Sequence, residues 1–158
     1  MPLKLNILVA TMTGTAGSVA QTIELAVGDA ETEVRVIPMD GQDARVFADG
    51  DLFLICTSTY GQGDVPDNAK QLYESLQRSR PDLSHVRYGV IGLGDRTYAD
   101  TFCMGGKRFD GLLTDLGARR VGEMLQHDAS SGTMPEEVAE QWIGPWVEQA
   151  RAAMGAAA

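Results

Sequence analysis

The first residues that could do chemistry are the threonines and the glycine of the segment TMTGTA, which spans residues 11–16 and carries no charged side chain. Just after it, Ser18 with Gln21 fits the S-x-x-Q pattern of a helix start. Hydroxyls and free backbone N–H groups at the positive end of a helix dipole are suited to hold a phosphate. The segment lacks the lysine of a nucleoside triphosphate loop, so it predicts a site for a single terminal phosphate. The alternative, that these residues only cap a helix and turn the chain, stays open on this segment alone.

Two later segments place a tyrosine among glycines. Tyr60 stands in TYGQGD and Tyr98 in GLGDRTY, and each segment follows an apolar run. Stacking on an aromatic side chain contributes about 1–3 kcal/mol per base in nucleic-acid complexes, so two tyrosines could hold a flat ring without an ionic contact. Glycines let the backbone approach such a ring and read its polar edge. Each tyrosine alone could be a surface turn residue, but the pair beside a phosphate loop favours a ligand with a phosphate and an aromatic ring.

These segments belong to a chain that alternates strands with helices. Apolar or alternating runs predict strands at residues 5–9, 33–38, 52–55, 87–92 and 121–125. Amphipathic spacing predicts helices at residues 18–27, 44–48, 64–76, 106–116 and 135–150, the last kinked or broken at Gly144 and Pro145. Right-handed βαβ units predict an α/β three-layer sandwich around a five-stranded parallel sheet. With strand order 2-1-3-4-5, the loops after the first, third and fourth strands meet at the carboxyl edge, where such sheets bind ligands.

Length and charge limit what the chain can be. With 158 residues, 44% of them hydrophobic, we expect a single domain over residues 1–158. The 13 basic and 22 acidic residues give a net charge of −9, which argues against nucleic acid and membranes as partners and favours a basic protein. The chain shows no signal-peptide pattern and no apolar run near the roughly 18 residues of a membrane helix, so we expect a cytoplasmic protein.

Neither a metal centre nor a hydrolytic site is indicated. Cys56 falls on a predicted buried strand and Cys103 in a loop, without the spacing of metal ligands. His85 and His127 are interpreted as loop and loop-edge residues rather than catalytic groups. No Ser/His/Asp or paired-carboxylate arrangement is present, so we predict no catalytic residue.

The three segments, with Phe102, Cys103 and the run GKRFDGLL at residues 106–113, resemble those of flavodoxins. The likeness extends from Leu5 to about Trp146 and is greatest to the short-chain group related to the FMN domains of sulfite reductase and cytochrome P-450 reductase. It implies FMN as the cofactor. By this resemblance the phosphate is held by Thr11, Met12, Thr13, Gly14, Thr15 and Ala16. The isoalloxazine ring is held by Ser58, Thr59, Tyr60, Gly61, Gln62, Gly63, Leu93, Gly94, Asp95, Tyr98, Phe102 and Cys103, with Tyr60 and Tyr98 flanking it.

Two positions depart from the family pattern. Met12 takes a place that is often glutamine, although its backbone N–H group is kept. Between Tyr98 and Phe102 this chain has one residue more than its relatives. The extra residue affects the expected placement of Tyr98, Asp100 and Cys103 around the ring.

The resemblance implies an electron carrier rather than a stand-alone enzyme. It would receive electrons from an NAD(P)H-dependent flavoprotein reductase and pass them singly to a redox enzyme with a basic docking surface, and we expect a monomer. Asp64, Asp67, Asp95 and Asp100 lie on or beside the ring-binding loops, where they would oppose a negative reduced flavin and attract such a partner. The alternative is a stand-alone FMN-dependent NAD(P)H:quinone oxidoreductase. A phospho-receiver domain shares the architecture but needs acidic residues at strand ends where this chain has threonines.

Overall fold

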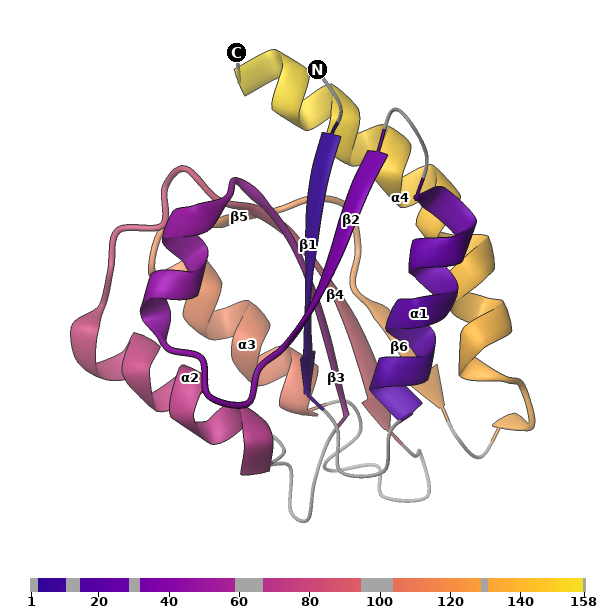
Figure 1. Ribbon diagram of the computed structural model, residues 1–158, viewed down its shortest axis with the longest axis horizontal. Helices are drawn as coiled ribbons and strands as arrows, with labels where there is room; N and C mark the ends of the chain where they lie inside the picture. The colour runs from indigo at the N-terminus through magenta and orange to yellow at the C-terminus, as the bar shows by residue number, and fades with distance from the viewer. Residues whose placement is uncertain are drawn as a thin grey trace.

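The computed structural model describes residues 3–10, 15–28, 32–58, 67–94, 104–128 and 131–157, which form a sheet between two helical layers (Figure 1). The strands are β1 (Leu3–Ala10), β2 (Thr32–Pro38), β3 (Leu52–Ser58), β4 (Arg87–Gly94), β5 (Arg119–Arg120) and β6 (Leu125–Asp128). The helices are α1 (Thr15–Val27), the 3₁₀-helix η1 (Ala44–Asp49), α2 (Asp67–Ser79), α3 (Met104–Asp115) and α4 (Pro135–Ala157).

The sheet is parallel and has the order β2-β1-β3-β4-β5, with β6 also paired to β4. The predicted order 2-1-3-4-5 is therefore confirmed. Because all pairs are parallel, the carboxyl ends of the strands lie along one edge of the sheet.

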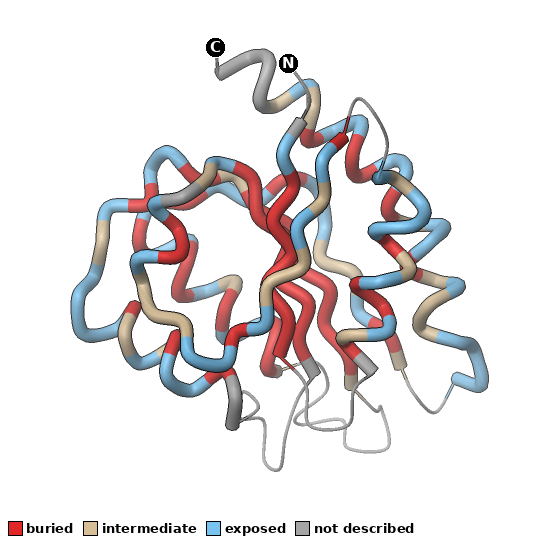
Figure 2. Tube along the Cα trace, in the orientation of Figure 1, coloured by how far each residue is buried: buried red, intermediate tan, exposed pale blue. Residues whose placement is uncertain are grey.

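Both faces of the sheet are buried. Helices α1 and α4 cover one face, and η1, α2 and α3 cover the other. Along β3, Leu54 and Cys56 face the α1 and α4 layer, whereas Phe53 and Ile55 face the opposite layer. Figure 2 shows the central strands as buried segments between partly exposed helices. Coverage on both sides explains why β1, β3 and β4 are nearly continuous apolar runs, and it confirms the three-layer α/β fold.

The predicted fifth strand at residues 121–125 is wrong. The chain instead forms two short strands, β5 before this stretch and β6 from Leu125 onward. The Val121 N–H group still donates to the Tyr88 carbonyl at 2.7 Å, but Gly122 has a φ of 67°, in the left-handed region that favours glycine. The turn at Gly122 takes residues 122–124 out of the ladder, and pairing with β4 resumes where Leu125 lies opposite Ile91.

Several predicted helix boundaries differ from the observed ones, and those of α1 and α4 contradict a specific sequence signal. Helix α1 begins at Thr15, so Ser18 lies inside its first turns and is not the cap that the S-x-x-Q pattern indicated. Helix α4 is not broken at Pro145 and continues to Ala157. Pro145 is exposed, so water can reach the carbonyl group that loses its N–H partner there. No helix in the described part of the chain, α4 included, is long and apolar enough to cross a membrane.

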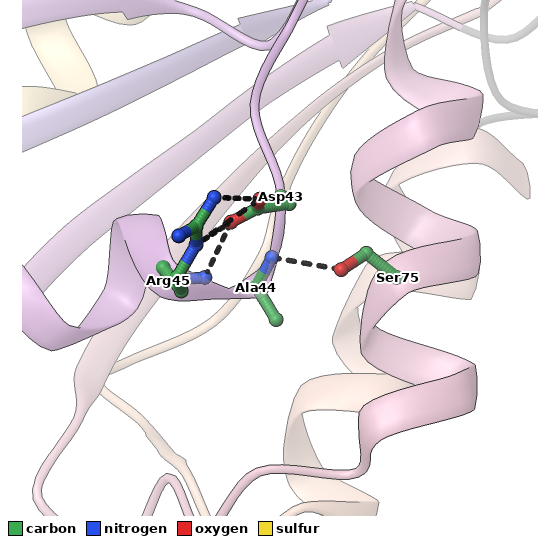
Figure 3. Close-up of polar contacts among 4 residues, drawn as sticks. All are labelled: Asp43, Ala44, Arg45 and Ser75. Atoms are coloured by element: carbon green, nitrogen blue, oxygen red, sulfur yellow. Dashed lines mark hydrogen bonds and ion pairs between the residues drawn. The ribbon is translucent and has the colours of Figure 1, made fainter.

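The connection between β2 and β3 is held by Asp43, which caps the predicted short helix, here η1 (Figure 3). Its carboxylate accepts the Arg45 N–H at 2.9 Å and pairs with the Arg45 guanidinium at 2.8 Å. The Arg45 hydrogen bond lowers the pKa of the Asp43 carboxyl. The Ala44 N–H donates to Ser75 Oγ at 3.0 Å, which ties η1 to α2.

Helix α3 is tied to the sheet by Tyr88. The phenol oxygen lies 2.7 Å from Asp110 Oδ1 and 2.7 Å from Thr114 Oγ1, both on α3. Asp110 Oδ2 in turn pairs with Arg120 on β5 at 2.7 Å. Burial of the ring raises the pKa of Tyr88 well above its ordinary value, so the phenol stays a neutral donor. This network fixes α3 relative to β4 and β5.

Helix α4 approaches the sheet through Trp146, which is 2% exposed. Its Nε1–H donates to the Val121 carbonyl at 2.9 Å. The indole lies directly against Gly89 of β4, where an added Cβ would come within 2.5 Å of Nε1. Only glycine at this position leaves room for the indole on the sheet.

Replacing Gly89 by alanine should lower the free energy of unfolding by about 3 kcal/mol, because the rigid, buried Trp146 must move. The matched control is Gly111→Ala at an exposed position of α3, where an added Cβ meets no atom within 4 Å. That change should stabilise by about 0.5–1 kcal/mol through helix propensity. Urea denaturation of both variants measures the difference, and equal stability would contradict the close packing at Gly89.

Candidate functional site

The ends of β1, β3, β4 and β6 lie side by side at the carboxyl edge of the sheet. In the register, Ala10 lies opposite Thr57, Ser58 opposite Leu93, and Gly94 opposite Asp128. The strand ends that precede residues 11–14, 59–66 and 95–103 in the sequence are therefore neighbours in the sheet. This is the edge at which sheets of this kind bind ligands.

Part of the predicted site falls on described residues. Thr15 and Ala16 begin α1, Ser58 ends β3, and Leu93 and Gly94 end β4. The remaining predicted site residues lie outside the described residues, and their roles stay predictions: Thr11, Met12, Thr13, Gly14, Thr59, Tyr60, Gly61, Gln62, Gly63, Asp95, Tyr98, Phe102 and Cys103.

The first turn of α1 is anchored to β3 by Cys56. Cys56 and Ala16 are both fully buried, and the Cys56 thiol donates to the Ala16 carbonyl with an S···O distance of 3.4 Å. Burial raises the pKa of Cys56 to about 12, so the sulfur stays a neutral thiol and is no nucleophile. The contact holds the start of α1, with its free N–H groups, at the carboxyl edge. Sequence analysis placed Cys56 on a buried strand, as observed, but did not find this contact.

The first turn of α3 is equally close to β4. Gly106 is buried, and a Cβ added there would lie 3.1 Å from Val90 Cγ1, 3.2 Å from the Gly92 Cα and 3.5 Å from Met124 Sδ. Glycine at residue 106 thus lets the helix lie almost on the backbone of β4, near the point where that strand ends. The sequence marks residue 106 only as a helix start, two residues after the observed one.

The end of β6 is an element that sequence analysis did not include in the site. His127 is buried, and its Nε2 lies 3.1 Å from both the carbonyl and the Oγ1 of Thr133. Ser131 Oγ donates to the Asp128 carbonyl at 2.7 Å. These contacts tie residues 131 and 133 to the end of β6, where Asp128 lies opposite Gly94, so His127 serves the structure of this edge.

The described part of the edge offers binding chemistry rather than acid–base chemistry. His85, the other histidine, lies away from it, with Nε2 3.0 Å from the Phe47 carbonyl. Within the described residues, no group of three or more His, Cys, Asp or Glu side chains could hold a metal ion. Helix N–H groups and small residues at the strand ends suit a phosphate and a flat ring lying against the backbone.

Comparison with known proteins shows which family this chain resembles. The flavodoxin family model matches residues 7–142. The chain is 45% identical to protein MioC of Escherichia coli strain K12 over 96 residues, which are 61% of this chain and 65% of that relative, just under two thirds of its length. It is 36% identical to part of the sulfite reductase (NADPH) flavoprotein alpha-component of Vibrio vulnificus, over 87% of this chain and 23% of that protein. The solved structure of a point mutant of the flavodoxin from Pseudomonas aeruginosa matches with a TM-score of 0.83 and 36% identity, over 93% of this chain and 98% of that one.

The buried thiol predicts a dependence of stability on pH. The folded pKa of Cys56, about 12, is raised above its ordinary value of 9.0. The stabilisation it gives is therefore complete below pH 9 and is lost as the pH rises toward 12. Above about pH 9 the wild type should lose its advantage over Cys56→Ala by up to about 1.4 kcal/mol per pH unit. Urea denaturation between pH 8 and about 10.5 measures this, and curves that stay parallel would contradict it. The titration of Tyr88 is common to both proteins and cancels.

The close approach of α3 to β4 predicts that alanine substitution has different effects at two glycines of this helix. Gly106→Ala should be less stable than Gly111→Ala by about 1–2 kcal/mol, because Val90 and Gly92 crowd residue 106 whereas residue 111 is exposed with open space around it. Gly106→Ala should also bind FMN about threefold more weakly, since it displaces the start of α3, while Gly111→Ala keeps wild-type affinity. Thermal unfolding and fluorescence titration of FMN check the pair. Equal FMN affinity of the two variants would show that the packing at residue 106 does not position the cofactor.

Proposed function

We propose that this chain, which belongs to the flavodoxin family, carries single electrons from an NAD(P)H-dependent flavoprotein reductase to an acceptor enzyme. FMN is the cofactor of this family. The observation that carries the proposal is the meeting of the ends of β1, β3 and β4 with the starts of α1 and α3 at one edge, in a chain whose family match covers residues 7–142.

The described residues fit the cofactor. FMN has a phosphate at one end and a flat ring at the other, and it supplies one-electron chemistry when bound. The start of α1, held by the Cys56 contact to Ala16, offers N–H groups to the phosphate as part of the proposed ligand segment at residues 11–16. The end of β4, with the buried Leu93 and the half-buried Gly94, offers its backbone to the ring. The loops at residues 59–63 and 95–103 complete the proposed site.

The role of the protein is then to bind, orient and set the charge around the cofactor. The segment at residues 11–16 contains no lysine, so its neutral donors would leave the negative charge of a bound phosphate unneutralised. Together with the net charge of −9, this disfavours adding further negative charge to the ring, which makes the reduced protein a stronger electron donor. The same charge attracts a basic acceptor, and this attraction weakens with salt.

The similarity to the sulfite reductase component supports the proposed donor. That relative is by name a flavoprotein that uses NADPH, and the segment of it that resembles this chain is one part of a larger protein. A reductase of that chemistry is therefore the donor we propose. A stand-alone quinone oxidoreductase is not favoured, since the matching family and relatives are flavodoxins and a flavoprotein component.

The test is an absorption spectrum of the protein after removal of excess FMN, followed by stepwise anaerobic reduction. We expect about one FMN per chain and reduction in two separate one-electron steps, because a carrier must hold one electron at a time. A protein that takes up no FMN would overturn the proposal. Steady oxidation of NADPH by the protein alone with a quinone would instead establish the stand-alone enzyme.

A further inference from the structure

We propose that a cleft between α4 and the connection from β5 to β6 is a second docking point for the redox partner and takes an arginine side chain of that protein. The inference rests on the proposed electron-carrier function. The cleft has a volume of about 300 Å³ and is lined by Gly122, Glu123, Trp142, Pro145, Trp146 and Gln149. It lies away from the strand ends that form the candidate cofactor site, at the interruption of the fifth strand position.

The apolar wall of the cleft consists of two indoles. Trp142 and Trp146 stack with ring centroids 5.6 Å apart and planes inclined by 18°. Trp146 is 2% exposed, because it lies between Gly89 and Trp142, and its Nε1–H is used by the Val121 carbonyl, so it backs the wall of the cleft and supports Trp142. Trp142 is half-buried and lines the cleft, so it supplies the accessible indole surface. An indole face attracts cations, and a guanidinium also stacks on it as a flat group.

The polar rim has acceptors and a negative charge. Glu123 carries the only charge among the lining residues, and the Gln149 carboxamide oxygen lies over Gly122, 2.6 Å from where a Cβ would be. Arg120 borders the cleft, and its Nε–H donates to the Gly122 carbonyl at 3.1 Å. Its charge is compensated by the ion pair with Asp110 at 2.7 Å. The cleft therefore combines the indole of Trp142 with the Glu123 carboxylate, which makes no ion pair with another described residue, and this is the chemistry that recognises a flat cation.

The openness of the cleft favours a side chain that projects from a partner over a free small molecule. Gly122, Glu123, Pro145 and Gln149 are all exposed, whereas sites for free ligands bury most of the ligand surface. Arginine is also enriched at the centres of protein interfaces, and the net charge of −9 draws basic partners to this chain.

The position of the cleft suits a partner that sits over the strand ends. Strand β6 runs from the cleft to the carboxyl edge, where Asp128 lies opposite Gly94. The chain from Glu123 to Asp128 spans at most about 17 Å, at about 3.4 Å per residue. A protein of ordinary interface size covers both points at once.

The first experiment uses the two tryptophans as reporters, because both tryptophans of the chain line the cleft. FMN-loaded protein is titrated with N-acetyl-arginine amide and with the neutral analogue N-acetyl-citrulline amide, at fixed ionic strength. We expect a saturable change in tryptophan emission with arginine and at least about tenfold weaker binding of citrulline. Equal binding of the two probes, or no change in emission, overturns the inference.

Matched variants separate the cleft from the overall charge. Glu123→Gln should weaken binding of the arginine probe about fivefold, whereas Glu148→Gln, an exposed residue of α4 outside the cleft, should change it by less than about twofold. The two variants have the same net charge. Trp142→Leu, with Trp146 kept as the reporter, should lose most of the binding while the protein stays folded. Equal effects of the two glutamine variants, or undiminished binding by Trp142→Leu, would overturn the inference.

The docking role is measured with cytochrome c, a basic protein, as electron acceptor. At low salt, Glu123→Gln should lower the second-order transfer rate about threefold relative to Glu148→Gln; equal rates would overturn the role in docking. The probe titration needs no electron transfer, so the two proposals fail separately. A protein that takes up FMN and is reduced in two steps but binds no arginine loses only this inference. A protein that takes up no FMN loses the proposed function.

Discussion

The burial of the sheet on both faces is the constraint on which the rest of this structure depends. The peptide groups of β1, β3 and β4 lie between two helical layers, out of reach of water, so they must pair with one another. Side chains on both faces of these strands must be apolar for the same reason. Polar residues that could bind a ligand can therefore lie only beyond the ends of the strands. Because the strands are parallel, the carboxyl ends of β1, β3 and β4 lie at the same edge of the sheet.

Small residues set how closely the helical layers approach this sheet. Gly89 admits the indole of Trp146 on one face, and Gly106 lets α3 lie on Gly92 on the other. The thiol of Cys56 fastens the start of α1 to β3. Each contact joins a helix to a central strand over a few ångströms. The starts of α1 and α3 are thereby held at the carboxyl edge, which is where a cofactor phosphate and ring need fixed partners.

Much of the fold could be predicted from the sequence, because strands buried on both faces produce apolar runs that are hard to mistake. The runs in β1, β3 and β4 were found in this way, whereas the short helix at residues 44–48 and the strand order were predicted without such a run and are also observed. The fifth strand was not, because Val121, Met124 and Leu125 look like one strand and only the backbone turn at Gly122 divides it. The contacts of Cys56 with Ala16 and of Gly106 with Gly92 join residues far apart or on different elements, so local spacing carries no sign of them. The candidate site was predicted from whole motifs that resemble a family, and most of those residues lie outside the described part of the chain.

The divided fifth strand position also bears on how the molecule behaves among its own copies. An open parallel sheet ends in unpaired backbone groups on both sides, and such edges can template the pairing of a neighbouring chain. Here one edge strand is β2, in which Glu33 and Arg35 are exposed and which ends at Pro38. The other edge consists of the two-residue β5 and the four-residue β6, set apart by the turn at Gly122. Neither edge offers a long, flat, uncharged row of hydrogen-bonding groups. The turn at Gly122 that interrupts the strand thus protects the sheet against edge-to-edge aggregation.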